Sequence, residues 1–301
     1  MSVPVAGVMG QAGAGPTWSP EQAAAAFAHC ERAARDHYEN FPVASLLLPR
    51  PLRPHVAALY AFARQADDYA DEAAFEGRRL ELLSGWRRAL DQAARGTAGH
   101  PVFIALGETL RRHPLPLALL HDLLSAFEQD VTVSRYETFD QVLAYCRLSA
   151  NPVGRLVLHL FGRARPETLE RSDTLCTALQ LANFWQDIAV DLDKKRCYLP
   201  GEEQRRFGVT AAMLEARRLT SPIAALIAFQ IDRTRSLFDR ARDLPRLTGG
   251  RLGIELRLVL AGGRRVLDLI EAAGYDVFTR RPALARRDWA LLSARALLGA
   301  S

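Results

Sequence analysis

The chain has 301 residues, 49% of them hydrophobic and 24% charged, a balance ordinary for a soluble globular protein with a large core. Its net charge of +5 favours an anionic partner, but no basic run interleaved with aromatic residues, zinc-finger spacing or RNA-binding motif points to nucleic acid. No apolar run approaches the roughly 18 residues of a transmembrane helix. The four cysteines form no CxxC pair, which is typical of reduced, mostly buried thiols in a cytosolic protein.

The predicted elements are helices throughout. Residues 1–18 open with a Gly/Ala-rich stretch that lacks the basic start of a signal peptide, so we expect a disordered tail. The first helix begins with a capping box of Ser19 and Gln22, and it should end before Pro42. Further helices are expected at 51–74, 80–94, 101–112, 116–130, 138–148, 152–161, 166–191, 221–244 and 250–274, with a short one near the C-terminus. Without strand patterns or linkers, residues 19–301 should form one all-α domain.

Two of these helices carry a polar stripe. The first stripe, at offsets of 0, 4, 7 and 11, consists of Tyr60, Arg64, Asp67 and Asp71. The second, at offsets of 0, 3, 7 and 11, consists of Gln180, Asn183, Asp187 and Asp191. Both spacings place the side chains on one helix face. The neighbours of the second stripe are apolar nearly all round, which predicts a buried helix.

A buried helix does not hold two unpaired carboxylates without compensation. Mg²⁺ is the natural partner, because it takes one or two carboxylates together with substrate phosphates. Two facing Asp pairs would hold a Mg²⁺ cluster and a diphosphate, whose departing charge the metal would neutralise. The carbocation left behind would need a dry apolar cavity.

The alternative for each stripe is a solvated helix face, since acidic patches are common. The basic segment at 193–198 could reach the diphosphate or only cap the preceding helix. Tyr145 could point at the cavity or only pack. No HExxH, Gly-x-Ser-x-Gly or dinucleotide-binding motif is present.

The segments YAFARQADDYADE (60–72) and LQLANFWQDIAVDLDKKRCYLP (179–200) resemble the two signature segments of squalene and phytoene synthases. Residues 136–162 and 263–281 resemble the segment between them and the C-terminal one. The resemblance implies an isoprenoid-synthase helical bundle, Mg²⁺ and isoprenyl diphosphates. It implies metal binding by Asp67, Asp71, Asn183, Asp187 and Asp191. It places Tyr145 beside the carbocation as a catalytic residue together with the four aspartates. The residues it implies for substrate binding are Arg64, Gln180, Asn183, Arg196, Tyr198 and Arg264.

Departures from the family pattern indicate which branch of the family this chain resembles. Head-to-head synthases usually offer hydroxyl groups to a diphosphate near the first helix, where this chain has HYENFPVASLLLP (37–49). The Gly of the Tyr-Cys segment is replaced within residues 149–152, and Gly263 stands where a Tyr is frequent, which should leave room in the cavity. These features resemble the hydroxysqualene synthase branch of bacterial hopanoid biosynthesis, which quenches the cation from presqualene diphosphate with water and uses no NADPH.

We therefore predict a carbon–oxygen lyase that converts presqualene diphosphate to hydroxysqualene. The enzymatic alternative is a squalene or phytoene synthase, a prenyltransferase that condenses two prenyl diphosphates. The non-enzymatic alternative is a helical assembly protein that has kept the fold. We expect a cytoplasmic location with reversible membrane contact, favoured by four basic residues near the C-terminus: Arg280, Arg281, Arg286 and Arg287.

Overall fold

The computed structural model describes residues 18–36, 48–285, 287–289 and 292, and these residues are almost entirely helical. Within them the only bridge between extended residues joins Arg135 to Cys197. The longer helices are α1 (Pro20–Asp36), α3 (Arg53–Asp71), α4 (Arg79–Ala94), α5 (Pro101–Arg112), α6 (Leu117–Thr132), α7 (Phe139–Ser149), α8 (Asn151–Leu160), α9 (Pro166–Gln186), α13 (Ser221–Ala241) and α15 (Gly250–Ala272). The shorter ones are η2 (Arg50–Leu52), η3 (Ala73–Phe75), α10 (Ile188–Asp193), α11 (Gly201–Arg206), α12 (Ala211–Glu215) and α14 (Leu244–Thr248). The all-α prediction is confirmed.

Local signals set several helix ends as predicted. The Ser19 hydroxyl accepts from the Gln22 amide at 3.1 Å, and the Gln22 side chain accepts from the Ser19 amide at 2.8 Å, which completes the capping box of α1. Thr138 and Gln141 make the same reciprocal bonds at the start of α7. Trp18, assigned to the tail, donates its indole N–H to the Ala98 carbonyl at 2.9 Å, so ordered packing begins before residue 19.

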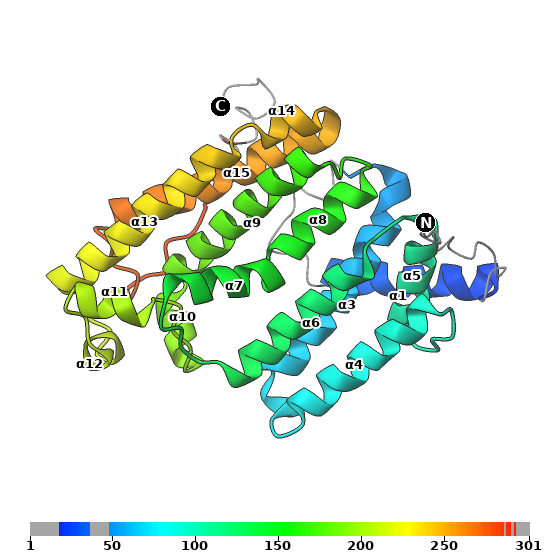
Figure 1. Cartoon of the computed structure of the whole chain (residues 1–301), viewed down its shortest axis with the longest axis horizontal. Coiled ribbons are helices and arrows are strands. Elements are labelled where there is room, and N and C mark those ends of the chain that lie inside the picture. The colour runs from blue at the N-terminus through cyan, green and yellow to red at the C-terminus, as the bar shows by residue number, and fades with distance from the viewer. Residues whose placement is uncertain (1–17, 37–47, 286, 290–291, 293–301) are drawn as a thin grey trace, which may run out of the picture.

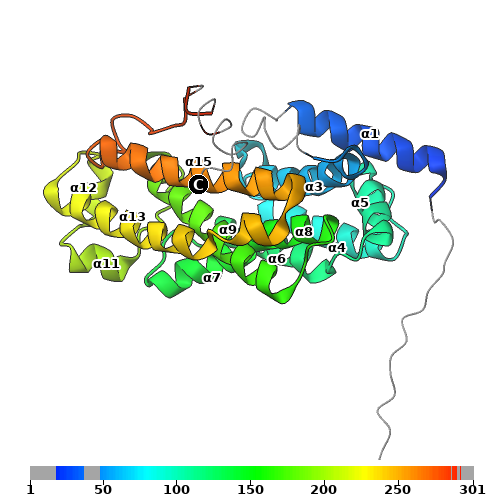
Figure 2. The ribbon, with the colours of Figure 1, turned by 90° about the horizontal axis from the view of Figure 1, so that it is seen from above.

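The bundle contains two large apolar cores, and Figure 1 shows the helices that surround them. One lies among α7, α9, α13 and α15 and includes the fully buried Trp185 and Phe238. The other lies among α1, α3, α4, α5 and α6 and includes Phe62 and Phe103. Helix α8 contributes Leu156 to the second core while packing along α9 of the first, and so joins the two halves. Figure 2 shows α1 and α15 along the same side of the molecule.

One helix predicted as continuous is divided into two in the structure. The helix predicted over 166–191 is broken at Asp187, whose backbone angles of −104° and 14° separate α9 from α10. Aspartate is a weak helix former, and this one lies between the two helical segments. The Asp187 amide still donates to Asn183 at 2.9 Å, and the Asp191 amide donates to Asp187 at 2.8 Å, so the helical spacing of the stripe survives.

Other boundaries differ modestly. The helix expected to reach residue 244 ends at Ala241 and is followed by the separate α14, while α11 and α12 were not predicted. The segment 37–47, which carries most of the departure at HYENFPVASLLLP, lies outside the described residues, as do residues 1–17 and most of the short C-terminal helix. None of the described helices is both long enough and apolar enough to span a membrane.

Candidate active site

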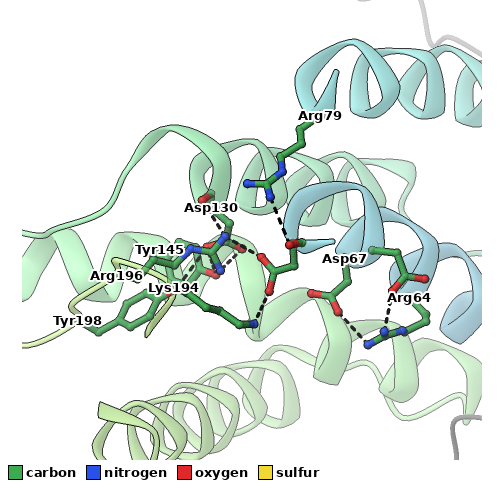
Figure 3. A network of polar contacts seen from close by, with 10 residues as sticks. Arg64, Asp67, Arg79, Asp130, Tyr145, Lys194, Arg196 and Tyr198 are labelled. Atoms are coloured by element: carbon green, nitrogen blue, oxygen red, sulfur yellow. Dashed lines mark hydrogen bonds and ion pairs between the residues drawn. The ribbon is translucent and has the colours of Figure 1, made fainter. Parts of the chain in front are cut away.

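The first Asp pair lies on α3, and Figure 3 shows Asp67 beside Arg64. Arg64 contacts Asp67 at 3.1 Å and Asp68 at 2.6 Å, so one guanidinium holds two neighbouring carboxylates. Asp71 ends the helix, and its backbone carbonyl accepts from the Arg79 guanidinium at 3.3 Å. The predicted grouping of Arg64, Asp67 and Asp71 is therefore present in the fold.

The basic segment after α10 reaches across to this pair. The Asp71 carboxylate is held by Lys194 at 2.5 Å and by Arg196 at 2.7 Å, contacts between residues more than 120 positions apart in the chain. The turn that aims these side chains has Lys195 at a φ of 59°. It is anchored where the Cys197 amide donates to the Ser134 carbonyl at 2.8 Å. Arg196 and Lys194 thus lie beside α3 rather than serving only as helix caps.

Asp130, at the end of α6, is a site residue that sequence reasoning missed. Its carboxylate accepts from the Tyr145 hydroxyl at 2.8 and 2.9 Å and from the Tyr198 hydroxyl at 3.4 Å. Arg196 donates to its backbone carbonyl at 2.8 Å. No motif marks Asp130 in the sequence, because its partners come from α7 and from the segment after α10. These bonds connect Tyr145 and Tyr198 to the residues that surround Asp71 (Figure 3).

Tyr145 and Tyr198 also belong to an aromatic cluster. Phe184 stacks on Tyr198 with ring centroids 3.7 Å apart, and Tyr145 lies 6.0 Å from Phe184 and 5.7 Å from Tyr198. Tyr136 stacks on the other side of this group, 5.7 Å from Tyr198. Since aromatic faces are electron-rich, such a cluster can stabilise a positive charge placed against it.

The second Asp pair lies at the junction of α9 and α10. Arg281 pairs with Asp187, through one contact of 3.0 Å and a second shorter one, and donates to the Gln186 side-chain oxygen at 3.1 Å. Arg281 was expected on a lipid-facing basic surface, but the structure places it in the site. For Asp191, no side-chain ion pair occurs among the described residues, although its backbone carbonyl accepts from the Arg196 amide at 2.8 Å.

The pKa values of Asp67, Asp71 and Asp191 are shifted in different directions. Burial, followed by the charge of Asp187, raises the pKa of Asp191 to about 7. Burial and the charge of Asp71 raise the pKa of Asp67. Burial also acts on Asp71, but hydrogen bonds from Lys194 and Arg196 outweigh it and lower the pKa of that carboxyl. The charge of Lys194, which contacts Asp71 at 2.5 Å, helps to lower the pKa of that carboxyl and opposes the rise in the pKa of Asp67 and Asp191.

Mg²⁺ fits these residues as part of a shared site. Within the described chain no group of three or more His, Cys, Asp or Glu side chains could hold a metal ion by itself. Mg²⁺ commonly takes only one or two protein carboxylates and completes its shell with water and substrate phosphates, so that absence agrees with each Asp pair as a partial site. A bound cation would also favour the ionised forms of Asp67 and Asp191, whose pKa values are raised without it.

An apolar cavity of about 590 Å³ lies next to the second pair, among α9, α15, the α7–α8 junction and the C-terminal segment. Gln180 and Asn183 line it, as predicted for that stripe, and Arg281 joins it to Asp187. Most of its remaining wall is aliphatic, with Val153, Leu258 and Val266 among the contributors. This space adjoins a carboxylate site and suits a hydrocarbon chain.

Gly263 lines the cavity, but a side chain at this position would point into packed neighbours and not into the cavity space. A Cβ at this position would lie 2.5 Å from the Phe238 ring and 2.8 Å from Leu179, so the glycine permits α15 to pack closely on α13 and α9. Arg264, expected to bind substrate, instead pairs with Asp239 of α13 and is not among the cavity-lining residues. The structure therefore does not bring Arg264 together with the other predicted site residues.

The squalene/phytoene synthase family model matches residues 34–288. A hydroxysqualene synthase from Zymomonas mobilis is 38% identical over 226 residues, covering 73% of this chain and 75% of that protein. A phytoene synthase from Mycobacterium tuberculosis is 31% identical over 272 residues, covering 89% of each.

Two solved structures share the fold of this chain. The squalene synthase HpnC from Alicyclobacillus acidocaldarius has a TM-score of 0.81 and 41% identity over 86% of this chain and 97% of that one. A dehydrosqualene synthase with a TM-score of 0.83 and 24% identity, covering 93% of this chain and 98% of that one, shows the shared fold alone. The chain therefore belongs to the squalene/phytoene synthase family, whose members act on prenyl diphosphates.

Proposed function

We propose that the chain is a hydroxysqualene synthase, which ionises presqualene diphosphate and adds water to the rearranged cation, releasing diphosphate. The observation that carries this proposal is that Lys194 and Arg196, which follow the second Asp pair in the chain, contact Asp71 of the first pair. Gln180 and Asn183, from the stripe of the second pair, line the apolar cavity. Hydroxysqualene synthases, at 38% and 34% identity, support this choice of product over phytoene synthases, at 31% and 32%. The departure at 37–49 from the usual head-to-head pattern supports the same choice. The 41% identity to the squalene synthase HpnC favours the head-to-head alternative.

The diphosphate would lie between the two Asp-bearing segments. Mg²⁺ held there by Asp67, Asp71, Asn183, Asp187 and Asp191 would supply Lewis-acid neutralisation of the leaving group. Lys194 and Arg196, which contact Asp71, would bind the phosphate oxygens. Arg281 offers a third cation from the cavity side, and Arg64 fixes the direction of Asp67.

The hydrocarbon part of the substrate would occupy the cavity, with Gln180 and Asn183 at its polar end. Aliphatic walls exclude bulk water and so protect the cation from early quenching. Tyr145 would stabilise the positive charge through its ring, although Tyr145, Phe184 and Tyr198 are not among the residues that line the cavity. The Asp130 carboxylate, which accepts from the Tyr145 hydroxyl, fixes the ring of that tyrosine.

The deciding experiment supplies either presqualene diphosphate or farnesyl diphosphate with Mg²⁺, each with and without NADPH, and identifies the products by mass spectrometry. We expect hydroxysqualene from presqualene diphosphate without NADPH, and little consumption of farnesyl diphosphate alone. Efficient conversion of farnesyl diphosphate to presqualene diphosphate, squalene or phytoene would identify the chain as a head-to-head synthase instead. That second candidate is favoured by the long match, 89% of each chain, to a phytoene synthase. No turnover of any prenyl diphosphate would favour the non-enzymatic alternative.

We further propose a cytoplasmic location with reversible contact with anionic membranes, since both substrate and product would be C30 lipids. Arg280 is exposed and suits such contact, whereas Arg281 is committed to Asp187 and Arg286 lies outside the described residues. Flotation with anionic vesicles tests this, and absence of binding at low salt would contradict it.

A further inference from the structure

Glu255 of α15 is an acidic residue in the cavity wall that the mechanism above does not use. It is half-buried, and no hydrogen bond or ion pair of its side chain occurs among the described residues. Burial alone raises the pKa of this carboxyl to about 7, with no charged neighbour contributing. An acid without a partner in an apolar cavity costs stability, and groups retained at such a cost are candidates for function.

Two other polar side chains in the cavity wall, Gln186 and Arg281, are already engaged, while Gln180 and Asn183 are the ones assigned above to the polar end of the substrate. The Gln186 amide donates to the Pro282 carbonyl, its oxygen accepts from Arg281, and Arg281 pairs with Asp187. Ser149, at the end of α7, differs from these because its Oγ is buried and has no hydrogen-bond partner among the residues that the structure describes. The wall of this cavity therefore holds a carboxyl and a hydroxyl group that are both without a partner in the described part of the chain. Together they offer the donor and the acceptors that an enclosed water molecule needs.

We propose that Glu255 and Ser149 hold the water that quenches the cation, and that the Glu255 carboxylate accepts the proton this water loses. The inference rests on the proposed function, which requires a water inside an otherwise apolar cavity. Glu255 lies on the cavity face of α15 with Leu258, Val259 and Gly262, at helical spacing, so its carboxylate shares the space assigned to the hydrocarbon chain.

The step balances without an added oxidant or reductant. Diphosphate leaves with the electron pair of the carbon–oxygen bond, and a lone pair of the water oxygen forms the new bond to the rearranged cation. The resulting oxonium gives one proton to Glu255, which leaves a neutral alcohol and a carboxylic acid that returns the proton to solvent. Without a held water, the cation loses a proton from a neighbouring carbon and gives a hydrocarbon with one more double bond.

The test measures the ratio of alcohol to hydrocarbon products formed from presqualene diphosphate and Mg²⁺, with ¹⁸O-labelled water to trace the oxygen. Glu255→Gln keeps the shape of the side chain and removes the proton acceptor, so we expect the ratio to fall at least about tenfold. Ser149→Ala should lower the ratio less, and Glu255→Asp should restore part of it. Glu271→Gln is the matched control, because Glu271 lies on α15 but pairs with Arg235 on the outer surface.

The outcomes separate the two proposals. If the unmodified chain releases no diphosphate from presqualene diphosphate, the proposed function fails and the inference fails with it. If that chain makes hydroxysqualene and Glu255→Gln makes it in the same ratio, only the inference is overturned. Thermal melting shows whether each variant is folded. Since the change in the ratio is read among products already formed, a general loss of activity does not mimic it.

Discussion

At the scale of single residues, the site contains carboxyl groups whose environments push their pKa values in opposite directions. Asp71 has its pKa lowered because two cations outweigh its burial, while Asp191 has its pKa raised to about 7 by burial and by Asp187. Asp130 has its pKa raised to about 6, chiefly by burial, although Arg196 and Tyr145 oppose this. A partner that brings positive charge would favour the ionised forms of Asp130 and Asp191.

Replacing a motif carboxylate should therefore abolish catalysis without unfolding the chain. Asp191→Asn should lower turnover at least about a hundredfold, the scale of losing one preorganised charge contact. Asp193→Asn is the control, because Asp193 lies two residues further on, is 65% exposed and pairs with Arg217. Steady-state assays on both variants, with circular dichroism for folding, check the prediction. Near-normal turnover of Asp191→Asn would contradict the assignment.

The raised pKa of Glu255 predicts that its contribution to the free energy of unfolding depends on pH. Its pKa rises from 4.5 in the unfolded chain to about 7 in the folded one, so the protonated form is favoured by folding. This contribution is complete below about pH 4.5 and is lost as the pH rises through about 7. Glu255→Gln should hence be more stable than the unmodified chain by on the order of 2 kcal/mol at pH 8, with almost no gain at pH 4.5. Urea unfolding at both pH values measures it, and equal gains at both would refute it.

At the scale of elements, the C-terminal segment after α15 is fastened to the end of α9. Arg281 pairs with Asp187, and the Gln186 amide donates to the Pro282 carbonyl, so this segment forms one wall of the cavity. Asp276 begins the segment with a turn in which its carboxylate accepts from the Phe278 and Thr279 amides at 3.0 and 3.1 Å. The wall therefore depends on a few polar contacts made to α9.

Arg281→Gln should loosen this wall and weaken substrate binding together. Losing a hydrogen-bonded charge contact costs roughly 1.5–3 kcal/mol, which corresponds to a loss of kcat/KM of about tenfold to a hundredfold. Hydrogen exchange of residues 276–285 should become faster in the same variant. Arg280→Gln is the control, because Arg280 is the exposed neighbour. Unchanged exchange and unchanged kcat/KM in Arg281→Gln would rule out this role.

At the scale of the whole molecule, two apolar cores are joined through α8 and α9, and the Asp pairs come one from each half. The first pair lies on α3 of one core, and the second lies at the end of α9 of the other. Lys194 and Arg196, from the segment that follows the second pair, neutralise part of the acidic charge of the first pair through their contacts with Asp71. A ligand that binds both pairs would therefore link the two halves and stabilise the fold.

Mg²⁺ and inorganic diphosphate should accordingly raise the melting temperature more together than either does alone. Neither Asp pair forms a complete metal site within the described chain, so Mg²⁺ by itself should bind weakly. Differential scanning calorimetry with each ligand and with both measures this. Turnover should also stop in EDTA and return with Mg²⁺; full activity in metal-free buffer, or additive shifts in melting temperature, would show that the two ligands do not share a site.

The sequence by itself determined those features that depend on short spacing. Helix starts at Ser19 and Thr138 could be predicted because a capping box is read within four residues. The two stripes could be predicted because helical periodicity fixes which side chains share a face. The tertiary structure decided which distant groups meet. Asp130, Arg281 and Glu255 carry no local pattern, and Arg281 lies 94 residues from Asp187. Arg264 pairs with Asp239 because of how α15 packs on α13, an orientation that no spacing along one helix encodes.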